Sequence, residues 1–497
     1  MTRHLELRRG TYRDSVALMQ VSRAVADQPG VTAALVAMAT DLNLDLLAGM
    51  GFDRPDGPSP DDLLVAVDAI DDEALAGALG RLADALADRT RAANGLGEAP
   101  APRTVATAAA RTGRADLALV STPGRVAFVD AVDALEAGCS VMLFSDNVPV
   151  AQEVWLKDEA TRRGLLVMGP DCGTAVVSGV GLGFANVVRP GTVGLVAASG
   201  AGAQQVMSLL DGAAVGISHC LGVGGRDLSA AVGGRSTHAA LDLLDADPAT
   251  ELVVVVSKPP ADDVATAVRK HAERLRTPVL LALLGPAGPD LTESARLAVA
   301  AAGGSWREPR WWPAPEERRG RYPTVRGLFA GGTLCDEAAT VAASGLRGPV
   351  RSNIAHDPAL TLGDDLDPRG GHAMVDFGDD RLTRGRPHPM IDQARRIERL
   401  LREAADPTAG VLLLDVVLGH AAHPDPAAEL APAIRAAHER AAADGREVAV
   451  VVSLVGTSGD PQGLDRQAAA LVAAGASVHL SNAAAARKAV ELCEGSS

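Results

Sequence analysis

Residues Val193–Gln205 read VGLVAASGAGAQQ, and residues Gly327–Ala338 read GLFAGGTLCDEA. In both stretches a short apolar run predicts a buried strand, a turn of small residues follows, and a helical pattern begins directly after it. Glycine lets the backbone approach a ligand closely, and the free N–H groups and positive dipole end of the following helix favour an anion. The two turns therefore predict a phosphate site, with simple helix capping as the alternative for either turn alone. The predicted phosphate-binding residues are Ser199, Gly200, Ala201, Gly202, Gly331, Gly332, Thr333 and Leu334.

The same alternation of strand and helix extends over most of the chain and predicts an α/β protein with parallel sheets. Stretches rich in Gly and Pro divide it into four predicted domains, at residues 1–98, 104–189, 190–303 and 325–497. The last two share one plan of strand, Gly-rich turn, helix and further βα units. Because ligands bind open parallel sheets at the edge where the strands end, the two turns are candidates to face each other across an interface.

The composition excludes several classes of function. The 497 residues carry a formal net charge of −15, and aromatic residues make up only 2% of them. An acidic chain with few aromatic rings is not expected to bind nucleic acid through a basic face or by base stacking. No apolar run approaches the ~18 residues of a membrane-spanning helix, and the N-terminus lacks the apolar core of a signal peptide. Five scattered cysteines do not form a disulfide framework, so a cytoplasmic location without membrane contact is predicted.

Three shorter motifs contain side chains that react or bind metals elsewhere. In the turn Gly169–Gly173, Cys172 has no basic neighbour in the sequence, which favours a structural thiol over a nucleophile. The run Gly222–Asp227 lacks the spacing of a dinucleotide-binding signature. His420 and His423 stand three residues apart without a third ligand cluster, so no metal site is predicted.

Two loops concentrate positive charge. One sets Arg384, Arg386 and His388 on a Pro-stiffened backbone, which suits recognition of a carboxylate or phosphate; a solvated loop is the alternative. The other, residues 303–323, holds three of the four tryptophans and five arginines. It is predicted to be an interdomain strap that packs its tryptophans on neighbouring surfaces, in preference to a nucleic-acid arm.

At these motifs the chain resembles the succinyl-CoA synthetase superfamily, and within it the FdrA family, over nearly its whole length. Gly169–Gly173 is similar to the synthetase Gly-Pro-Asn-Cys turn, and Gly224–Asp227 to a Gly-Gly-Asp turn. Three stretches look like FdrA itself, namely Tyr12–Ser15, Ser257–Pro260 and Gly385–Pro389. The resemblance implies doubly wound parallel sheets, with a CoA-binding Rossmann-like domain followed by two flavodoxin-like domains.

The departures from the synthetases concern their phosphorylation machinery. The synthetases carry a phosphorylated histidine in a Gly-His-Ala-Gly loop, whereas Gly285–Gly288 reads Gly-Pro-Ala-Gly. Ser257–Pro260 stands where the synthetases place a supporting glutamate, and the first predicted domain is too short for an ATP-grasp. FdrA-like proteins are associated with breakdown of purine-derived ureides, where an FdrA-type subunit and two companions are linked to oxamate carbamoyltransfer. The resemblance thus implies a carbamoyltransferase that interconverts oxalurate plus phosphate with carbamoyl phosphate plus oxamate.

On this hypothesis the phosphate of carbamoyl phosphate lies between the two helix N-termini. Lys258 and His388 are the catalytic candidates: Lys258 to stabilise charge on the carbonyl oxygen, and His388, with Arg384 and Arg386, to hold the carboxylate of the small acid. No cofactor is required, and CoA is a candidate ligand. The expected partners are small-molecule substrates and the companion subunits of a hetero-oligomeric complex. Two alternatives stay open: an acyl-CoA ligase in which His388 or His423 replaces the missing histidine, and a non-catalytic scaffold subunit.

Overall fold

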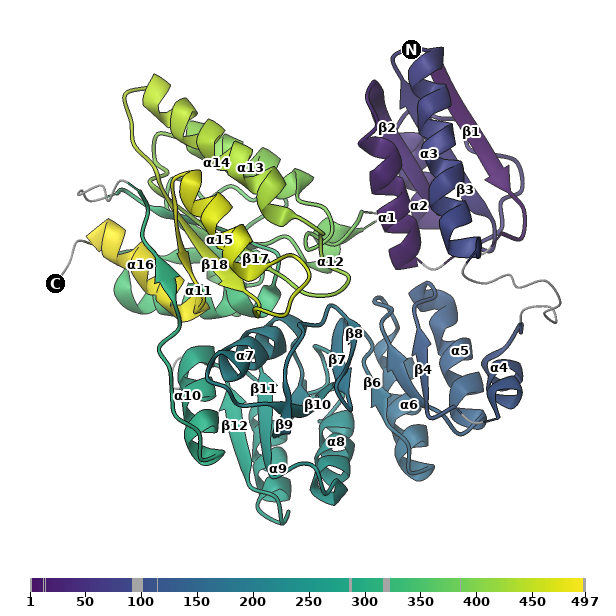
Figure 1. The fold of residues 1–497 in the computed structure, drawn as a ribbon, viewed down its shortest axis with the longest axis vertical. Helices are drawn as coiled ribbons and strands as arrows, with labels where there is room; N and C mark the ends of the chain where they lie inside the picture. The colour runs from purple at the N-terminus through teal and green to yellow at the C-terminus, as the bar shows by residue number, and fades with distance from the viewer. Residues whose placement is uncertain are drawn as a thin grey trace.

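The structure is a computed structural model that describes residues 2–11, 13, 15–91, 102–113, 115–285, 288–315, 322–384 and 386–494. Its strands form four sheets, and the first and last sheets lie above the second and third in Figure 1. Helices alternate with strands over most of the chain, and most strands of the later sheets are parallel, so the predicted α/β class is confirmed. Among the described helices, none combines the length and apolarity that a bilayer crossing requires.

The first sheet is antiparallel, although the strand–helix alternation predicts parallel sheets. β3 (Leu63–Ala69) lies between β1 (Thr2–Arg8) and β2 (Val31–Met38) and runs opposite to both. Because every residue of β3 is buried, its sequence is almost continuously apolar and does not reveal the strand's direction. Three helices cover the sheet: α1 (Ser15–Ala26) and α3 (Asp72–Arg91) on one face and α2 (Asp41–Gly49) on the other.

The second sheet is a small parallel sheet that packs against other elements on both faces. Its strands, in spatial order, are β4 (Leu117–Val120), β5 (Ser140–Leu143) and β6 (Val167–Met168). The helices on one face are α4 (Val105–Thr112), α5 (Gly124–Glu136) and α6 (Val150–Arg162). Met142 and Met168 point to the other face and pack into a core shared with the third sheet.

The third sheet contains a strand pair that the sequence analysis places in the preceding domain. Its parallel strands are β9 (Pro190–Ala197), β10 (Ile217–Gly222), β11 (Leu252–Ser257) and β12 (Val279–Leu283). β7 (Thr174–Val177) pairs antiparallel with β10, and β8 (Val180–Gly183) extends the sheet from β7. These two strands lie within the predicted domain 104–189, yet their backbone hydrogen bonds belong to the next sheet. The other domain boundaries stay predictions.

Four helices surround the third sheet, and α7 begins in the first Gly-rich turn. They are α7 (Gly200–Gly212), α8 (Arg235–Ala246), α9 (Asp262–Ala272) and α10 (Leu291–Ala301). All of β11 and the last five residues of β9 are buried, which explains the continuous apolar runs that mark them in the sequence.

The fourth sheet has seven strands and carries the second Gly-rich turn. Its strands, in spatial order, are β13 (Trp311–Trp312), β19 (Ala476–His479), β18 (Ala449–Val455), β17 (Val411–Val417), β14 (Val325–Phe329), β16 (His372–Asp376) and β15 (Val350–Ser352). Its helices are α11 (Gly332–Gly345), α12 (Asp380–Thr383), α13 (Ala394–Ala405), α14 (Pro426–Ala443), α15 (Leu464–Ala473) and α16 (Asn482–Glu494). α11 begins directly after β14, as the sequence predicts.

The third and fourth sheets share one hydrophobic core. Helices α7 and α10 pack against α11 and α16 between the two sheets, and buried residues of both halves form a single cluster. Hydrogen bonds also connect the two halves. Asn186 Nδ2 donates to Asp460 Oδ2 at 2.9 Å, and Asn482 N donates to Gln205 Oε1 at 3.0 Å. This packing fixes the starts of α7 and α11 relative to each other.

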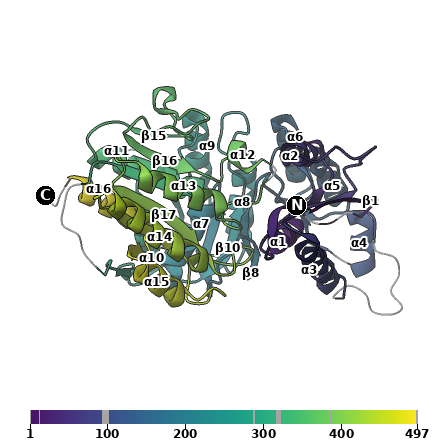
Figure 2. The ribbon, with the colours of Figure 1, turned by 90° about the horizontal axis from the view of Figure 1, so that it is seen from above.

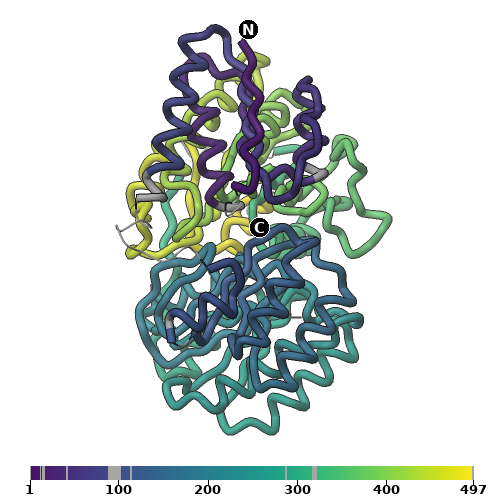
Figure 3. The backbone as a smooth tube through the Cα atoms, turned by 90° about the vertical axis from the view of Figure 1, so that its right-hand side faces the viewer, coloured from purple at the N-terminus to yellow at the C-terminus, as the bar shows by residue number. Residues whose placement is uncertain are grey.

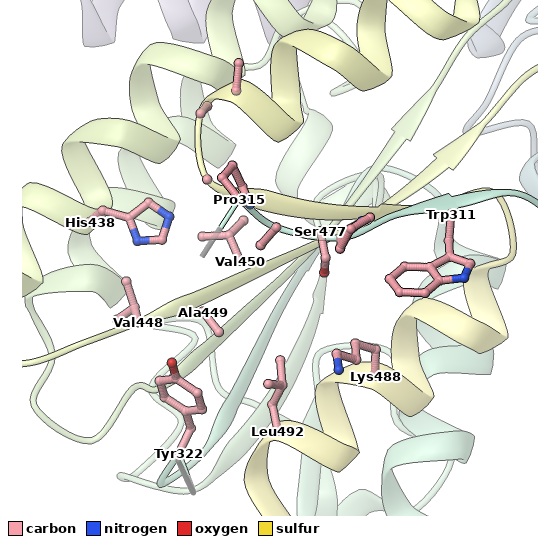
Figure 4. A pocket seen from close by; sticks show the side chains of 15 residues that line it. Trp311, Pro315, Tyr322, His438, Val448, Ala449, Val450, Ser477, Lys488 and Leu492 are labelled. Carbon is pink, nitrogen blue, oxygen red and sulfur yellow. The ribbon is translucent and has the colours of Figure 1, made fainter. Parts of the chain in front are cut away.

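The Trp-rich segment forms part of the strap that the sequence predicts. Trp311 and Trp312 add strand β13 to the edge of the fourth sheet by antiparallel pairing with β19, and Trp306 packs against the shared core. The strap covers a cavity of about 260 Å³ near the first residues of β18 and β19 (Figure 4). Because these strands run parallel to β14, the cavity lies at the opposite sheet edge from the start of α11. Residues 316–321 of the strap lie outside the described residues.

The first sheet is held to the fourth through helix α1. Figure 2 shows the first two sheets at one end of the molecule and the last two at the other, and Figure 3 shows the first sheet above the second. The guanidinium of Arg23 forms ion pairs with Asp392 and Glu429, and Glu429 also lies 3.3 Å from His423 Nε2. Arg23 therefore connects the N-terminal layer to the loop that follows His388.

Candidate functional site

The two Gly-rich turns meet at the interface between the third and fourth sheets. Ser199 Oγ donates a hydrogen bond to Thr333 Oγ1 at 2.5 Å, and Gly202 N donates to Ser199 Oγ at 2.9 Å. A Cβ atom placed on Gly331 would lie 2.7 Å from the Cβ of Ala201, which is too close for any side chain larger than hydrogen. The turns thus face each other, in contact and without a gap between them.

The contact between the two turns leaves no room for the phosphate that the sequence places between them. Six of the eight predicted residues are buried, and only Gly200 and Gly332 are partly exposed. The hydroxyls of Ser199 and Thr333 bond to each other, because the shared core draws the two helix starts together. A phosphate between the two helix N-termini does not fit this packing. An anion has access to the turns only from the side, at Gly200 and Gly332.

The two helix starts differ in how their N–H groups are satisfied. Ser199 caps α7, whereas Gly331 precedes α11 and provides no side-chain cap. Asp415 accepts hydrogen bonds from Ala330 N at 2.7 Å and Gly331 N at 2.8 Å, and Arg396 pairs with that carboxylate at 3.0 Å. Within the described residues, the N–H groups at the first positions of α11 have no acceptor outside the helix. Backbone N–H groups of this kind, which have no acceptor in the first turn of a helix, bind anions in other proteins.

Lys258 lies beside this open helix start. It follows β11 directly, and a Cβ on Gly332 would lie 3.0 Å from its Nζ and 2.6 Å from Asp376 Oδ2. The Lys258 side chain is partly exposed and makes no hydrogen bond or ion pair with any described residue. An ammonium group without a partner next to free N–H donors is suited to binding an anion.

His388 lies on the other side of Asp376. A Cβ on Gly378 would lie 2.9 Å from His388 Nε2 and 3.1 Å from Asp376 Oδ1. His388 Nδ1 accepts a hydrogen bond from Met390 N at 3.2 Å, and its ring centroid is 5.5 Å from that of Phe184. Although part of the ring is exposed, desolvation by the surrounding protein and the nearby Arg396 charge lower its pKa to about 4. His388 is therefore neutral at neutral pH.

Within the described residues, no hydrogen bond or ion pair joins the two arginines of the predicted carboxylate site to Gly332, Lys258 or His388. Arg384 and Arg386 are both exposed, and their side chains make no hydrogen bond or ion pair to the described residues. The charge of Arg384 lowers the pKa of Asp380, and the charge of Arg386 lowers the pKa of Arg395. Gly385 between them lies outside the described residues. The structure thus brings Lys258 and His388 to opposite oxygens of Asp376, while no such contact among the described residues joins either arginine to them.

Three aspartates that the sequence analysis omits belong to the site. Asp376 ends β16, Asp171 follows β6, and Asp415 lies in β17. Desolvation raises the pKa of Asp376 to about 7, against the opposing effects of Lys258 and of Gly378 N. The carboxylate of Asp171 is exposed to solvent, yet desolvation by surrounding protein and the charges of Asp380 and Asp146 raise its pKa to about 7 as well. The rule that parallel strands present ligand-binding residues at their carboxyl ends was the available signal for Asp171, which follows a predicted strand.

Cys172 occupies a packed turn and fits the favoured structural role. Burial raises the pKa of its thiol to about 12, so the thiolate is not formed at neutral pH. A Cβ on Gly222 would lie 2.6 Å from Cys172 Sγ, and one on Gly224 would lie 2.4 Å from Pro170 O. The two motifs that resemble synthetase turns therefore pack directly against each other.

Comparison with known proteins gives the family. The chain is 37% identical to "Uncharacterized protein YahF" of Escherichia coli over 96% of this chain and 95% of that protein. The chain belongs to the family of YahF. Together with the two domain matches below, this places it among the FdrA-like members of the succinyl-CoA synthetase superfamily.

Two family descriptions match this YahF-family chain. The N-terminal heavy metal-associated domain of AllF matches residues 1–102, and the CoA-ligase domain matches residues 328–492. The N-terminal segment contains no cysteine and only one histidine, His4, so it lacks the thiolates that soft metal ions prefer. The residues of this segment therefore do not fit a heavy-metal site. The second match covers the sheet that carries α11 and Asp376.

More distant relatives are CoA ligases. The chain is 27% identical to the alpha subunit of ADP-forming succinate–CoA ligase from Methanothermobacter thermautotrophicus, over 30% of this chain and 50% of that subunit. A solved structure of the dinucleotide-forming acetyl-coenzyme A synthetase 1 of Ca. Korarchaeum cryptofilum aligns with 81% of this chain and 88% of its own, at 15% identity and a TM-score of 0.32. The chain is a succinyl-CoA synthetase-like protein with a CoA-ligase domain.

Proposed function

We propose that this chain binds the phosphate group of an acyl phosphate at the N-terminus of α11 and takes part in transfer of the acyl group. The observation that carries the proposal is the open start of α11 at Gly332, with the Lys258 ammonium beside it. Free backbone N–H groups and an ammonium together provide charge-assisted hydrogen bonds to a phosphate. The match to a CoA-ligase domain supports acyl-phosphate chemistry at this sheet.

An acid–thiol ligase is the first candidate, because the relatives with named activities are ligases. In this reaction the sulfur of CoA attacks the acyl carbon, the bond from that carbon to the phosphate oxygen breaks, and phosphate leaves with the charge that α11 stabilises. We place the anionic part of CoA at the start of α5, because that helix has no side-chain cap. His388 lies on the Oδ1 side of Asp376, so we place it at the border of the same site as the candidate acceptor of a phosphoryl group.

Carbamoyl transfer is the second candidate, favoured by one feature of the sequence. The loop Gly285–Gly288 has no histidine, so the phosphoryl carrier of the synthetases is missing at its usual place. A reaction between phosphate and oxalurate needs no such carrier, because phosphate attacks the carbamoyl carbon directly and oxamate leaves. The same α11 site serves both candidates, since carbamoyl phosphate is itself an acyl phosphate.

Calorimetric titration of the full chain, alone and with its companion subunits, tests the proposal. Acetyl phosphate and carbamoyl phosphate should bind to the wild type and fail to bind to Gly332→Val. Formation of a thioester from acetyl phosphate and CoA would identify the ligase, and phosphate-dependent cleavage of oxalurate would identify the carbamoyltransferase. If neither acyl phosphate binds in any combination, the chain is a scaffold and the proposed function is wrong.

A further inference from the structure

Asp376 occupies a position that conflicts with an anion at Gly332 unless a proton is present. We infer that Asp376 takes up a proton when a dianion binds at the start of α11 and then donates that proton to the leaving group of the acyl transfer. The inference rests on the proposed function, because it concerns the same site. It assigns the acid of the reaction to Asp376, which no sequence motif singled out, instead of to His388.

The two carboxylate oxygens of Asp376 have different surroundings. Oδ1 accepts a hydrogen bond from Gly378 N at 2.8 Å and is thereby fixed. Oδ2 points toward Gly332, at 2.6 Å from the position of a Cβ there, and accepts no hydrogen bond from any described residue. The residue as a whole is only 5% exposed, so bulk water contributes little to its solvation. An oxygen of a mostly buried carboxyl group, bonded to no described residue, therefore faces the place where the ligand's phosphate is proposed to bind.

The groups around Asp376 do not neutralise it. Six titratable groups face it from the neighbouring elements: Lys258, Asp379, Asp415, Arg396, Cys335 and His388. Of the two cations among these six groups, Arg396 is paired with Asp415 at 3.0 Å, whereas Lys258 has no ion-pair partner among the described residues. Cys335 and His388 are neutral at neutral pH, because burial raises the pKa of the first and lowers that of the second. The surroundings thus hold the pKa of Asp376 near 7 before any ligand is present.

A bound dianion raises this pKa further. A phosphate at Gly332 would place negative charge next to Oδ2, and two like charges at contact distance in a poorly solvated site strongly favour protonation of one of them. The other candidates are less suited to the role. Both oxygens of Asp415 are occupied by Ala330 N, Gly331 N and Arg396, and His388 starts from a pKa of about 4. A proton on Asp376 turns the repulsive contact into a hydrogen bond from the carboxyl group to the ligand.

The chemical step balances with this proton. In the carbamoyl direction, an oxygen of hydrogen phosphate bonds to the carbamoyl carbon of oxalurate and the carbon–nitrogen bond breaks with its electron pair on nitrogen. Asp376 gives its proton to that nitrogen, which leaves as the amide of oxamate. The proton of the former hydrogen phosphate then returns Asp376 to its starting state. In the thiol direction, the phosphate released from the acyl phosphate receives the Asp376 proton, and the CoA thiol proton replaces it.

Proton uptake on binding is directly measurable. Sulfate is the probe, because it is a dianion of phosphate geometry that does not itself take up a proton near neutral pH. Titration of the full chain with sulfate in two buffers of different ionisation heat gives the number of protons bound per ion. For a group with a pKa near 7 we expect close to one proton per sulfate at pH 8 and about a tenth of a proton at pH 6.

Variants assign the proton to a residue. Asp376→Asn should still bind sulfate, with proton uptake at pH 8 lost and affinity nearly constant between pH 6 and pH 8. His388→Gln should keep the uptake, and so should the matched control Asp364→Asn, which removes an exposed carboxylate of the same sheet's loops. The wild-type and His388→Gln measurements stand even if Asp376→Asn does not fold.

The outcomes separate this inference from the proposed function. Sulfate binding without proton uptake by the wild type would overturn the inference and leave the proposed function intact. Loss of the uptake in His388→Gln would likewise overturn it and assign the proton to the histidine. Failure of sulfate, acetyl phosphate and carbamoyl phosphate to bind at all would overturn the proposed function, and the inference with it.

Discussion

The starts of α7 and α11 have the same sequence plan and opposite surroundings. At α7, the Ser199 hydroxyl accepts from Gly202 N and donates to Thr333, and nearly the whole turn is buried. At α11, Gly331 supplies no cap, Gly332 is partly exposed, and Lys258 and Asp376 stand beside it. The comparison teaches that a turn of small residues between strand and helix serves close packing as readily as ligand binding. The side chain at the cap and the neighbours from other elements decide between the two uses.

The largest expected effect tests the open helix start. In Gly332→Val the new side chain enters the space in front of Asp376 Oδ2 and Lys258 Nζ, where even a Cβ would be 2.6 Å and 3.0 Å from these atoms. We expect acyl-phosphate affinity to fall more than about 100-fold, equivalent to roughly 2.7 kcal/mol. Gly212→Ala is the matched control, because that glycine has no atom within 4 Å of its Cβ position. Unchanged binding by the valine variant would remove α11 as the ligand site.

Removal of the Lys258 charge should have the next largest effect. Lys258→Met keeps the length of the side chain and deletes its ammonium, so one charge-assisted hydrogen bond to the phosphate is lost. Such bonds contribute about 1.5–3 kcal/mol, which predicts a roughly 10- to 100-fold weaker affinity in a calorimetric titration. Lys270→Met, at an exposed position on α9, should bind normally. Equal affinities for the two variants would show that the helix start binds the anion alone.

The free energy of unfolding of the protein should depend on pH through the protonation of Asp376. Because the pKa of Asp376 in the folded protein is about 7 and its ordinary value is 3.8, the folded state holds more protons than the unfolded state between these pH values. Its contribution to stability therefore declines as pH rises through this window. We expect Asp376→Asn to be more stable than the wild type at pH 8 by on the order of 1–3 kcal/mol, and equal to it below about pH 4. Urea unfolding at both pH values measures this, and a gain of the same size at pH 4 would contradict the assignment.

The smallest effect on ligand binding is expected at the closed turn. Ser199→Ala removes the cap of α7 and the bond to Thr333, which should lower the free energy of unfolding by about 1–2 kcal/mol. Acyl-phosphate affinity should stay within about twofold of the wild type, because the hydroxyl does not face the ligand. Ser344→Ala, at an exposed position late in α11, is the control and should change neither property. A large loss of affinity in Ser199→Ala would mean that both turns bind the ligand.

Local sequence signals predicted the elements better than their assignment to sheets. The apolar runs of β9, β11 and β17 stand out in the sequence because each strand is buried on both faces. The antiparallel direction of β3 and the pairing of β7 with β10 could not be read in this way, because pairing partners are chosen by contacts between distant segments. The same limit applies to the site. The side-chain chemistry of Lys258 and His388 was enough to make them candidates. Asp376 could be assigned to the site only from the pairing of β16 with β14 in the structure.

The amino-acid sequence by itself determined the α/β class, the position of both Gly-rich turns and the absence of a histidine at Gly285–Gly288. These features depend on composition and on neighbours within a few residues, which a linear pattern records. Only the tertiary structure decided that the turns touch, that α7 is closed by Ser199 and Thr333, and that α11 stays open beside Lys258 and Asp376. Those outcomes depend on how the third and fourth sheets bury their common core. That packing brings together side chains more than a hundred residues apart, and no local pattern specifies it.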